Sequence, residues 1–378
     1  MIWIKRFSLL MFLLLLLVVA LFAYITLTNG GMQRIFSLGQ SYLVDELTIG
    51  GVDGKLVGPG SINDIAFNSA GTSVNVDSVD YDWNPRQLFS RKLSVETLQV
   101  KGVTVRLPET KPAAGEESAE PFQLKDLKIP FILEAKDLSV EDINIYPPGA
   151  DEPVVIDKIL LRADGEEDAI QLLDFQVDAP LGNLQVDGTL NTSGDWPLSL
   201  DTDWAFNHEQ FGQFTGSGSM IGDLKTLRVQ HEIKGLVDVT IDADVFDVTG
   251  MMSWDGNVKA SSDDLGEFSE GLAGIPFELD ADTKGSLEKF EAQGKLSSEH
   301  AETGPFTTDF NLSGDLEQIE FEDSTVVFEQ TPAKLTYSGT VDLTSLEADL
   351  TIDWEDLAYP LITEPKTVLS PELSLIHI

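Results

Sequence analysis

The chain has 378 residues, of which 42% are hydrophobic and 8% aromatic, and this apolar content predicts a folded protein. Its 64 acidic residues outnumber its 24 basic residues and give a formal net charge of -40, which argues against nucleic-acid binding because affinity for phosphate backbones depends on cationic side chains. The absence of cysteine excludes disulfides, thiolate metal ligands and cysteine nucleophiles.

The N-terminal region predicts a membrane anchor. Lys5 and Arg6 precede an uncharged apolar run at residues 7–27, which as a helix reaches roughly 32 Å and can cross a hydrocarbon core about 30 Å thick. A cleaved signal peptide is the alternative, but Leu21 stands where cleavage next to Ala23 needs a small residue. We therefore expect residues 1–6 in the cytoplasm, residues 7–27 as an uncleaved transmembrane signal anchor, and the bulk of the chain across the membrane.

The remainder of the chain predicts strands. Residues 31–47 have helical spacing and predict one short amphipathic helix, but beyond them apolar and polar residues alternate with period two. Residues 237–245 are the clearest case, with apolar residues at every odd position and mostly acidic ones between. Such strands have one apolar and one polar face, and their short glycine-containing connections predict antiparallel hairpins.

One phrase recurs at the turns. Gly-Asp-Leu-Lys-Thr-Leu at residues 222–227 returns as Gly-Ser-Leu-Glu-Lys-Phe at residues 285–290 and as Gly-Asp-Leu-Glu-Gln-Ile at residues 314–319. Each copy leads into an alternating stretch, so the phrase predicts a turn followed by a strand. Residues 108–121, rich in Pro, Glu, Ala and Ser, break the pattern and predict a flexible acidic loop between two sheet segments.

No constellation of residues predicts catalysis. The four histidines, which we interpret as exposed or turn residues, have no metal-ligand spacing, and no nucleophile elbow, phosphate loop or dinucleotide fingerprint is present. Residues 50–54 resemble a single copy of a calcium-binding repeat that requires tandem copies. We predict no catalytic residue, cofactor or metal site, and no enzyme activity.

The N-terminal sequence resembles that of a known family. Residues 52–67, then Val74 and Val76, Tyr81 and Trp83, and residues 87–103 follow the order of a Gly-x-Leu turn, two strands, a short Leu-containing segment and two more strands. This order, together with the anchor and the repeated phrase, resembles the N-terminal part of the TamB family (translocation and assembly module subunit) among AsmA-like bridge proteins. The resemblance makes residues 28–107 an AsmA/TamB-like β module and residues 122–372 a repetitive β-sheet groove.

The resemblance also implies a fold, a location and partners. It implies an all-β protein with a long, curved, mostly antiparallel repeat sheet forming a taco-like groove, anchored once in the inner membrane with its bulk in the periplasm. It further implies outer-membrane protein assembly or secretion with an Omp85-type outer-membrane barrel, and phospholipid transport between membranes. Family members are usually longer, and residues 373–378 abandon the alternation, so we interpret the chain as an N-terminal fragment with a non-native or truncated end.

The residues themselves favour an apolar ligand. A long one-layer sheet would expose its apolar face at about 25 cal/mol per Å², and phospholipid acyl chains could cover that face without any catalytic group. The candidate lipid-groove residues are Val237, Val239, Ile241, Val245, Leu346, Leu350, Ile352 and Trp354. Two alternatives remain: a structural or adhesin-like β-solenoid with a closed core, and a periplasmic enzyme, which would need converging polar residues.

Overall fold

The computed structural model describes residues 26–42, 46–69, 71–108, 125–209, 211–266, 273–345, 347–359, 361–362, 367–368 and 376–377. Contacts divide the chain into two compact units: unit 1 is Met1–Ser118 with Asp126–Ser193, and unit 2 is Ala119–Lys125 with Gly194–Ile378. The division falls at Ser193, inside the range 122–372 that the sequence analysis assigns to one groove.

The predicted anchor at residues 7–27 and the cytoplasmic residues 1–6 lie outside the described residues, apart from Thr26 and Leu27. Where the structure does describe the chain, it contains no helix of the length and apolarity that a membrane crossing requires. Of the predicted loop at residues 108–121 only Pro108 is described, and of residues 373–378 only residues 376–377.

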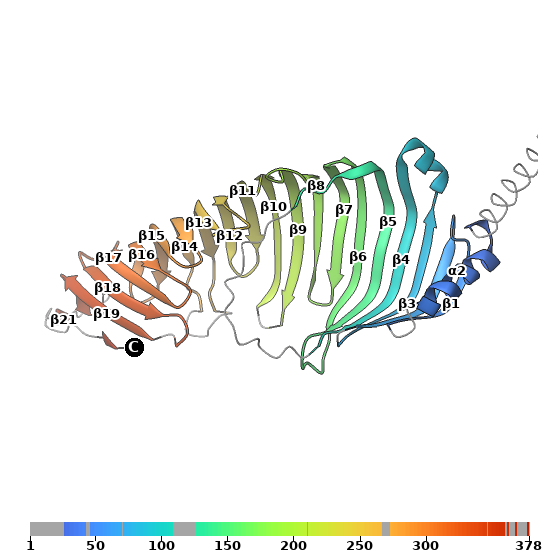
Figure 1. The fold of residues 1–378 in the computed structure, drawn as a ribbon. Coiled ribbons are helices and arrows are strands. Elements are labelled where there is room, and N and C mark those ends of the chain that lie inside the picture. The colour runs from blue at the N-terminus through green and yellow to red at the C-terminus, as the bar shows by residue number, and fades with distance from the viewer. Residues whose placement is uncertain are drawn as a thin grey trace, which may run out of the picture. The chain divides into compact units, whose positions relative to one another are not determined.

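In its described residues, unit 1 consists of a curved sheet with one α-helix (Figure 1). The helix, α2 (Asn29–Tyr42), confirms the helix predicted near residues 31–47 and contacts β1. The remaining elements are β1 (Leu47–Gly54), β2 (Gly60–Ser69), β3 (Thr72–Trp83), the 3-10 helix η1 (Pro85–Ser90), β4 (Lys92–Arg106), β5 (Ile129–Tyr146), β6 (Val154–Glu167), β7 (Ala169–Ala179) and β8 (Gly182–Asn191). Each strand pairs with the next one in sequence.

One pair in unit 1 departs from the predicted hairpins. β4 and β5 are parallel, with Lys92 opposite Ile132 and Arg106 opposite Tyr146, whereas all other neighbouring pairs in this sheet are antiparallel. Parallel strands begin at the same end of a sheet, so this pair cannot be a hairpin. It falls where the sequence predicts a loop between two sheet segments instead of a hairpin, and the prediction of a mostly antiparallel sheet is confirmed.

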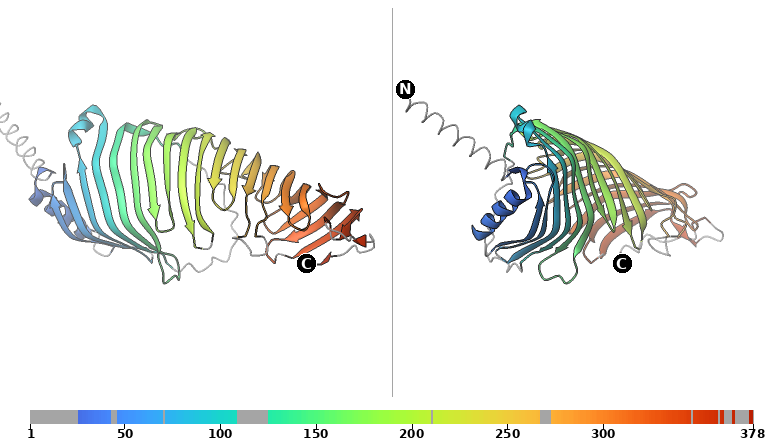
Figure 2. Two further views of the ribbon diagram at one scale, coloured as in Figure 1. Left: turned by 180° about the vertical axis from the view of Figure 1, so that it is seen from behind. Right: turned by 90° about the vertical axis from the view of Figure 1, so that its right-hand side faces the viewer.

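Unit 2 contains an antiparallel sheet whose strands also pair in sequence order (Figures 1 and 2). β22 (Ile376–His377) pairs with the last long strand, and β20 (Ala358–Tyr359) with β21 (Thr367–Val368). The long strands are β9 (Leu198–His208), β10 (Gly212–Gly222), β11 (Thr226–Lys234), β12 (Asp238–Phe246), β13 (Ser253–Ser262), β14 (Phe277–Ser286), β15 (Phe290–His300), β16 (Gly304–Gly314), β17 (Gln318–Phe328), β18 (Lys334–Asp342) and β19 (Ala348–Glu355).

The three copies of the repeated phrase form turns of unit 2, between β10 and β11, β14 and β15, and β16 and β17. Asp315 Oδ1 accepts hydrogen bonds from the backbone N–H groups of Glu317 and Gln318, both at 2.8 Å, and Asp223 Oδ1 accepts two at 2.9 Å. Such Asx turns satisfy the backbone at a tight reversal. These bonds hold the pKa of Asp315 below its ordinary value. The prediction that the phrase encodes a turn followed by a strand is confirmed.

Both sheets have little buried core. Among the described large apolar side chains, those that are buried are Met32, Ile143, Leu160, Leu227 and Phe328. Most other apolar strand residues are half-buried. This exposure is expected for a single-layer sheet, because no second sheet packs against its apolar face. Figure 2 shows that the strands of each unit bend along their length.

A row of kinks runs across six strands of unit 1. Its members are Gly50, Asp64, Asp77, Gly102, Asp142 and Asp157, which the flanking pairs place side by side. Apolar residues on either side of the row are three apart, such as Val76 and Val79, although strand side chains alternate with period two. The kink restores the apolar side chains to one face. Asp64, Gly102 and Asp142 accommodate it with left-handed backbone, at φ of 55°, 66° and 58°.

Candidate functional site

The strand register places one continuous apolar face on unit 2. Following paired residues from β9 to β19 gives a single row: Trp204, Gly216, Ile233, Val239, Ala260, Leu279, Leu296, Thr308, Val326, Leu335 and Trp354. Adjacent strands lie about 4.8 Å apart, so the row extends roughly 48 Å across the sheet. No charged residue interrupts it.

The structure brings most of the predicted groove residues onto this face. Val239, Ile241 and Val245 of β12 share it with Leu350, Ile352 and Trp354 of β19, and all six are half-buried. Val237 lies in the turn just before β12 and is half-buried. Leu346 lies outside the described residues.

Glycines on the apolar face leave room for neighbouring rings. A Cβ atom on Gly216 would lie 2.3 Å from the Trp204 ring, and one on Gly218 would lie 2.2 Å from His231 Nδ1. The rings can therefore lie flat across the adjacent strand, where any larger residue would push them away.

Two tryptophans of the apolar face direct their indole N–H groups toward protein partners, whereas Trp354 Nε1 is buried without one among the described residues. Trp204 Nε1 donates a hydrogen bond to His231 Nε2 at 2.8 Å, and the two rings are nearly parallel. Trp254 Nε1 donates to Thr283 Oγ1 at 3.2 Å, and burial raises the pKa of Tyr337. His231 is thus a half-buried residue of the apolar face, and its interpretation as an exposed or turn residue is wrong. Alternation within β11 was the signal for its placement.

Unit 1 has its own apolar face, made mostly of large aliphatic residues. One row across all eight strands contains Val52, Ile62, Val79, Val100, Val140, Ile159, Val177 and Leu184. Near its N-terminal end Tyr81 donates a hydrogen bond to the Lys55 carbonyl at 2.9 Å, and Trp83 Nε1 donates to the Leu56 carbonyl at 2.9 Å. These side chains are tied to the main chain, unlike Trp204.

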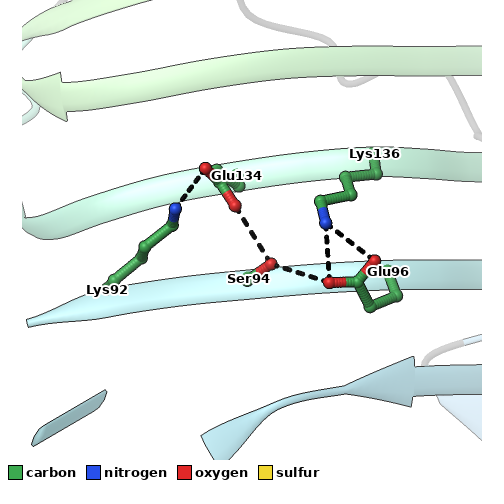
Figure 3. Close-up of polar contacts among 5 residues, drawn as sticks. All are labelled: Lys92, Ser94, Glu96, Glu134 and Lys136. Atoms are coloured by element: carbon green, nitrogen blue, oxygen red, sulfur yellow. Dashed lines mark hydrogen bonds and ion pairs between the residues drawn. The ribbon is translucent and has the colours of Figure 1, made fainter. Parts of the chain in front are cut away.

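Charged residues gather where β4 and β5 run parallel (Figure 3). Lys136 binds Glu96 at 2.8 Å, Lys92 forms an ion pair with Glu134, and the buried Ser94 hydroxyl lies 3.3 and 3.2 Å from these two carboxylates. The lysine hydrogen bonds hold the pKa of both glutamates below the ordinary value. Every carboxylate of this cluster is paired, so the cluster joins the two strands and offers no free acid or base.

The polar face of unit 2 contains shallow depressions rather than a catalytic cleft. One of about 480 Å³ is lined by Arg228, Asp244, Asp255, Asp282, Lys284 and Glu291, among others. Its cations are engaged in ion pairs, Arg228 with Asp244 at 3.0 Å and Lys284 with Glu291 at 3.3 Å. Within the described ranges no group of His, Asp or Glu side chains is arranged to hold a metal ion.

These features define a class of protein that is built from open, curved β-sheets, each with an apolar face that extends across many strands. The sequence profile of the family described as TamB, N-terminal domain, matches residues 15–149 and residues 119–355. The two matches together span most of the chain, which therefore belongs to the TamB family, as its sequence resemblance predicted. Searches of curated proteins and of solved structures found no match.

Proposed function

We propose that this chain is a membrane-anchored bridge protein whose apolar face binds phospholipid acyl chains and lets them move between the inner and outer membranes. The observation that carries the proposal is that few large apolar side chains are buried among the described residues, and long rows of them remain half-buried. Leaving such a face in water costs about 25 cal/mol per Å² of apolar surface. Acyl chains are a ligand that could cover it.

The chemistry of the face suits an acyl chain. Hydrocarbon tails make non-directional contacts and need a continuous apolar surface without charged groups. The indole nitrogens of Trp204 and Trp254 are bonded to protein partners, so those rings offer mainly apolar surface. The proposal requires no catalytic residue, cofactor or metal.

A closed β-solenoid fits the structure less well. A core filled by the protein's own side chains would bury most of its large apolar residues, as protein interiors are close-packed. In the described residues the large buried apolar side chains are few, and the sheets of both units are open. The alternative of a structural or adhesin-like solenoid is therefore disfavoured.

Family membership supports the cellular part of the proposal. We place the anchor at residues 7–27 in the inner membrane, the bulk of the chain in the periplasm, and an Omp85-type outer-membrane barrel as the partner in outer-membrane protein assembly. The net charge of -40 does not favour binding along an anionic lipid surface, which agrees with attachment through an apolar anchor.

Photo-crosslinking at single positions tests acyl binding directly. A benzophenone amino acid at Ile241 or Ile352, on the apolar face, should give light-dependent phospholipid adducts detected by mass spectrometry. The matched controls are Thr240 and Thr351, which precede these residues and are exposed on the polar face. Equal labelling of both faces, or no lipid adduct at either, would contradict the proposal.

Charge substitution provides a second test. Val239→Glu and Leu350→Glu should abolish phospholipid co-purification because a carboxylate on the apolar face would be desolvated by the tails. Thr240→Glu should retain the lipid. Circular dichroism should report the same strand content in all three variants, and wild-type lipid retention by both apolar-face variants would refute acyl binding there.

A further inference from the structure

One end of the unit 2 strands carries a row of exposed apolar side chains. The turns between β10 and β11, β12 and β13, β14 and β15, β16 and β17, and β18 and β19 all lie at this end, because the sheet is an antiparallel meander. We call it the leucine rim, comprising residues 223–225, 247–252, 287–289, 315–317, 343–345 and 347. Four of its apolar side chains are exposed: Met251 at 73%, Leu287 at 53%, Leu316 at 68% and Leu343 at 40%.

The repeated phrase supplies two of the four exposed side chains of this row. Leu287 and Leu316 are the leucines of the second and third copies, and each stands directly after the residue that caps the turn. A leucine is not required for the turn, because the bonds are made by Ser286 and Asp315 to backbone N–H groups. Isolated exposed leucines are common on protein surfaces, but a row at a repeated position indicates an interaction site.

The opposite end of the same strands differs in the residues that the structure describes. Its turns are residues 209–211, 235–237, 263–276, 301–303 and 329–333. In the described part of these turns no large apolar side chain is exposed, and the tips carry residues such as Glu302 and Gln330. Among the residues that the structure describes, exposed large apolar side chains therefore lie at the turns of one end of the sheet, and turn formation alone does not require them there.

Hydrogen bonds between neighbouring turns order parts of the leucine rim. The Val248 N–H donates to the Leu224 carbonyl at 2.9 Å, and the Leu343 N–H donates to the Glu317 carbonyl at 2.8 Å. Turns fixed in this way present their side chains at defined positions, which lowers the entropic cost of binding a partner. Leu224 itself is half-buried.

Spacing indicates the shape of the partner. Successive turns of the leucine rim are two strands apart, or about 10 Å. An α-helix places every seventh residue on one face at about 10.5 Å, whereas an extended strand reaches 10 Å after three residues and then presents its opposite face. A helix lying along the rim can therefore meet each turn with the same apolar stripe.

Charge indicates the flanks of the partner. The five turns contain six carboxylates against two lysines, and Lys225 is already paired with Asp195 at 2.9 Å. The carboxylates are Asp223, Asp247, Glu288, Asp315, Glu317 and Glu347, and the lysines are Lys225 and Lys289. Two copies of this rim would repel each other, and an anionic membrane would repel it as well.

We propose that the leucine rim is a docking surface for a cationic amphipathic helix of a partner protein, with an apolar residue at heptad spacing and Lys or Arg beside it. The helix lies along the turns and contacts Met251, Leu287, Leu316 and Leu343. The leucine rim lies at the turns, whereas the acyl chains are proposed to bind the apolar face of the strands. A result that contradicts one proposal therefore leaves the other standing.

The absence of cysteine allows a local test on the full-length protein in nanodiscs. Single cysteines replacing Glu317 on the rim or Glu302 on the opposite turns carry an environment-sensitive dye. The probe is a synthetic 28-residue helix with Leu at heptad positions and Lys on its flanks. We expect a saturable blue shift at the rim label and none at the opposite label. A matched helix with Glu flanks should give no shift at either label.

Variants then assign the contact. Leu287→Ser with Leu316→Ser should weaken binding of the cationic helix at least tenfold, whereas Leu181→Ser, at an exposed turn leucine of unit 1, should leave it unchanged. Unchanged binding by the rim variant would overturn the proposal. It would equally be overturned if the rim substitutions instead abolished self-association in sedimentation or binding to phosphatidylethanolamine–phosphatidylglycerol vesicles, since a second copy or a membrane would then be the occupant.

Discussion

The two units build the same kind of surface by different means. Unit 1 uses large aliphatic residues and a row of kinks, with Asp64, Gly102 and Asp142 in left-handed backbone, and contains one parallel pair. Unit 2 is antiparallel throughout its long strands and sets rings against glycines, as at Trp204 and Gly216. The comparison shows that a continuous apolar face can be built with different packing in each unit. It requires only that every strand place its apolar side chains on the same side of the sheet.

The difference predicts where each unit is most easily broken. In unit 1 the face depends on backbone conformation at the kinked row, so substitutions there should be the most damaging. In unit 2 the face depends on side chains that are only half-buried, so equivalent truncations should cost less. The experiments below are ordered by the size of the expected effect.

The largest effect is expected at Gly102 in the kinked row. Gly102→Val should lower the free energy of unfolding by about 3 to 4 kcal/mol, because φ is 66° and a Cβ would lie 2.1 Å from Asp77 Oδ2. Gly51→Ala is the control, since nothing lies within 4 Å of its Cβ position. Hydrogen exchange of β3 and β4 in urea measures the loss. Equal effects of the two substitutions would show that the row tolerates ordinary backbone.

A smaller loss of stability is expected when an isoleucine of either apolar face is truncated, and its size should differ between the two units. Ile143→Ala, which truncates a buried residue of unit 1, should cost about 3 kcal/mol, and Ile241→Ala, which truncates a half-buried residue of unit 2, about 1 to 1.5 kcal/mol. Hydrogen exchange of β5 and β12 on delipidated protein is the appropriate measurement. If Ile241→Ala cost as much as Ile143→Ala, the apolar face of unit 2 would be covered more fully than its exposure indicates.

Sequence alternation predicts much of this architecture. It predicts all-β structure, the strand at residues 237–245 and the shared face of Ile241 and Ile352, because a period of two fixes side-chain direction within a strand. The repeated phrase predicts the turns, since Gly and Asp have specific roles at reversals. The matching family profile also confirms the resemblance drawn from residues 52–103.

The features that sequence reasoning missed depend on contacts between strands. The parallel pairing of β4 with β5 depends on the end of the sheet at which β5 begins, and an acidic loop does not specify a direction. The kinked row is visible only when Val76 and Val79 are placed against Val103 and Val100. The hydrogen bond that His231 accepts from Trp204 is also a contact between strands, because Trp204 lies on β9 and β10 separates it from β11.

A modest loss of stability is expected where a side chain, and not the main chain, accepts the hydrogen bond of a tryptophan. His231→Phe keeps a ring beside Trp204 but removes the acceptor of its indole N–H, and should cost about 1 kcal/mol. In unit 1 the acceptor for Trp83 is the Leu56 carbonyl, which no side-chain substitution removes. Fluorescence of single-tryptophan variants should therefore change for Trp204 and stay constant for Trp83. A constant Trp204 signal would mean that the hydrogen bond does not fix this ring.

The smallest effect on stability is expected from changes in pH and salt concentration, which act on carboxylates with a lowered pKa. The pKa of Asp315 is lowered chiefly by the Glu317 N–H, and that of Glu134 chiefly by Lys92. A carboxylate whose folded pKa is depressed stabilises the protein above its unfolded pKa, near 4, and this contribution is lost as the pH falls through the folded value.

Salt should distinguish the two carboxylates. High salt screens the Lys92–Glu134 pair, whose side chains are 31% and 26% exposed, but does not break a backbone hydrogen bond to Asp315. Protection against hydrogen exchange at pH 6 should thus fall at the β4–β5 pair in 1 M NaCl and remain unchanged at the turn between β16 and β17, whereas acid should lower the protection of both, measured against the intrinsic exchange rate at each pH. Asp315→Asn removes the charge but keeps an acceptor, so it should abolish the acid response of that turn while leaving the β4–β5 response intact. Acceleration of both sites by salt would show that ion pairing, and not backbone capping, also holds the turns of unit 2.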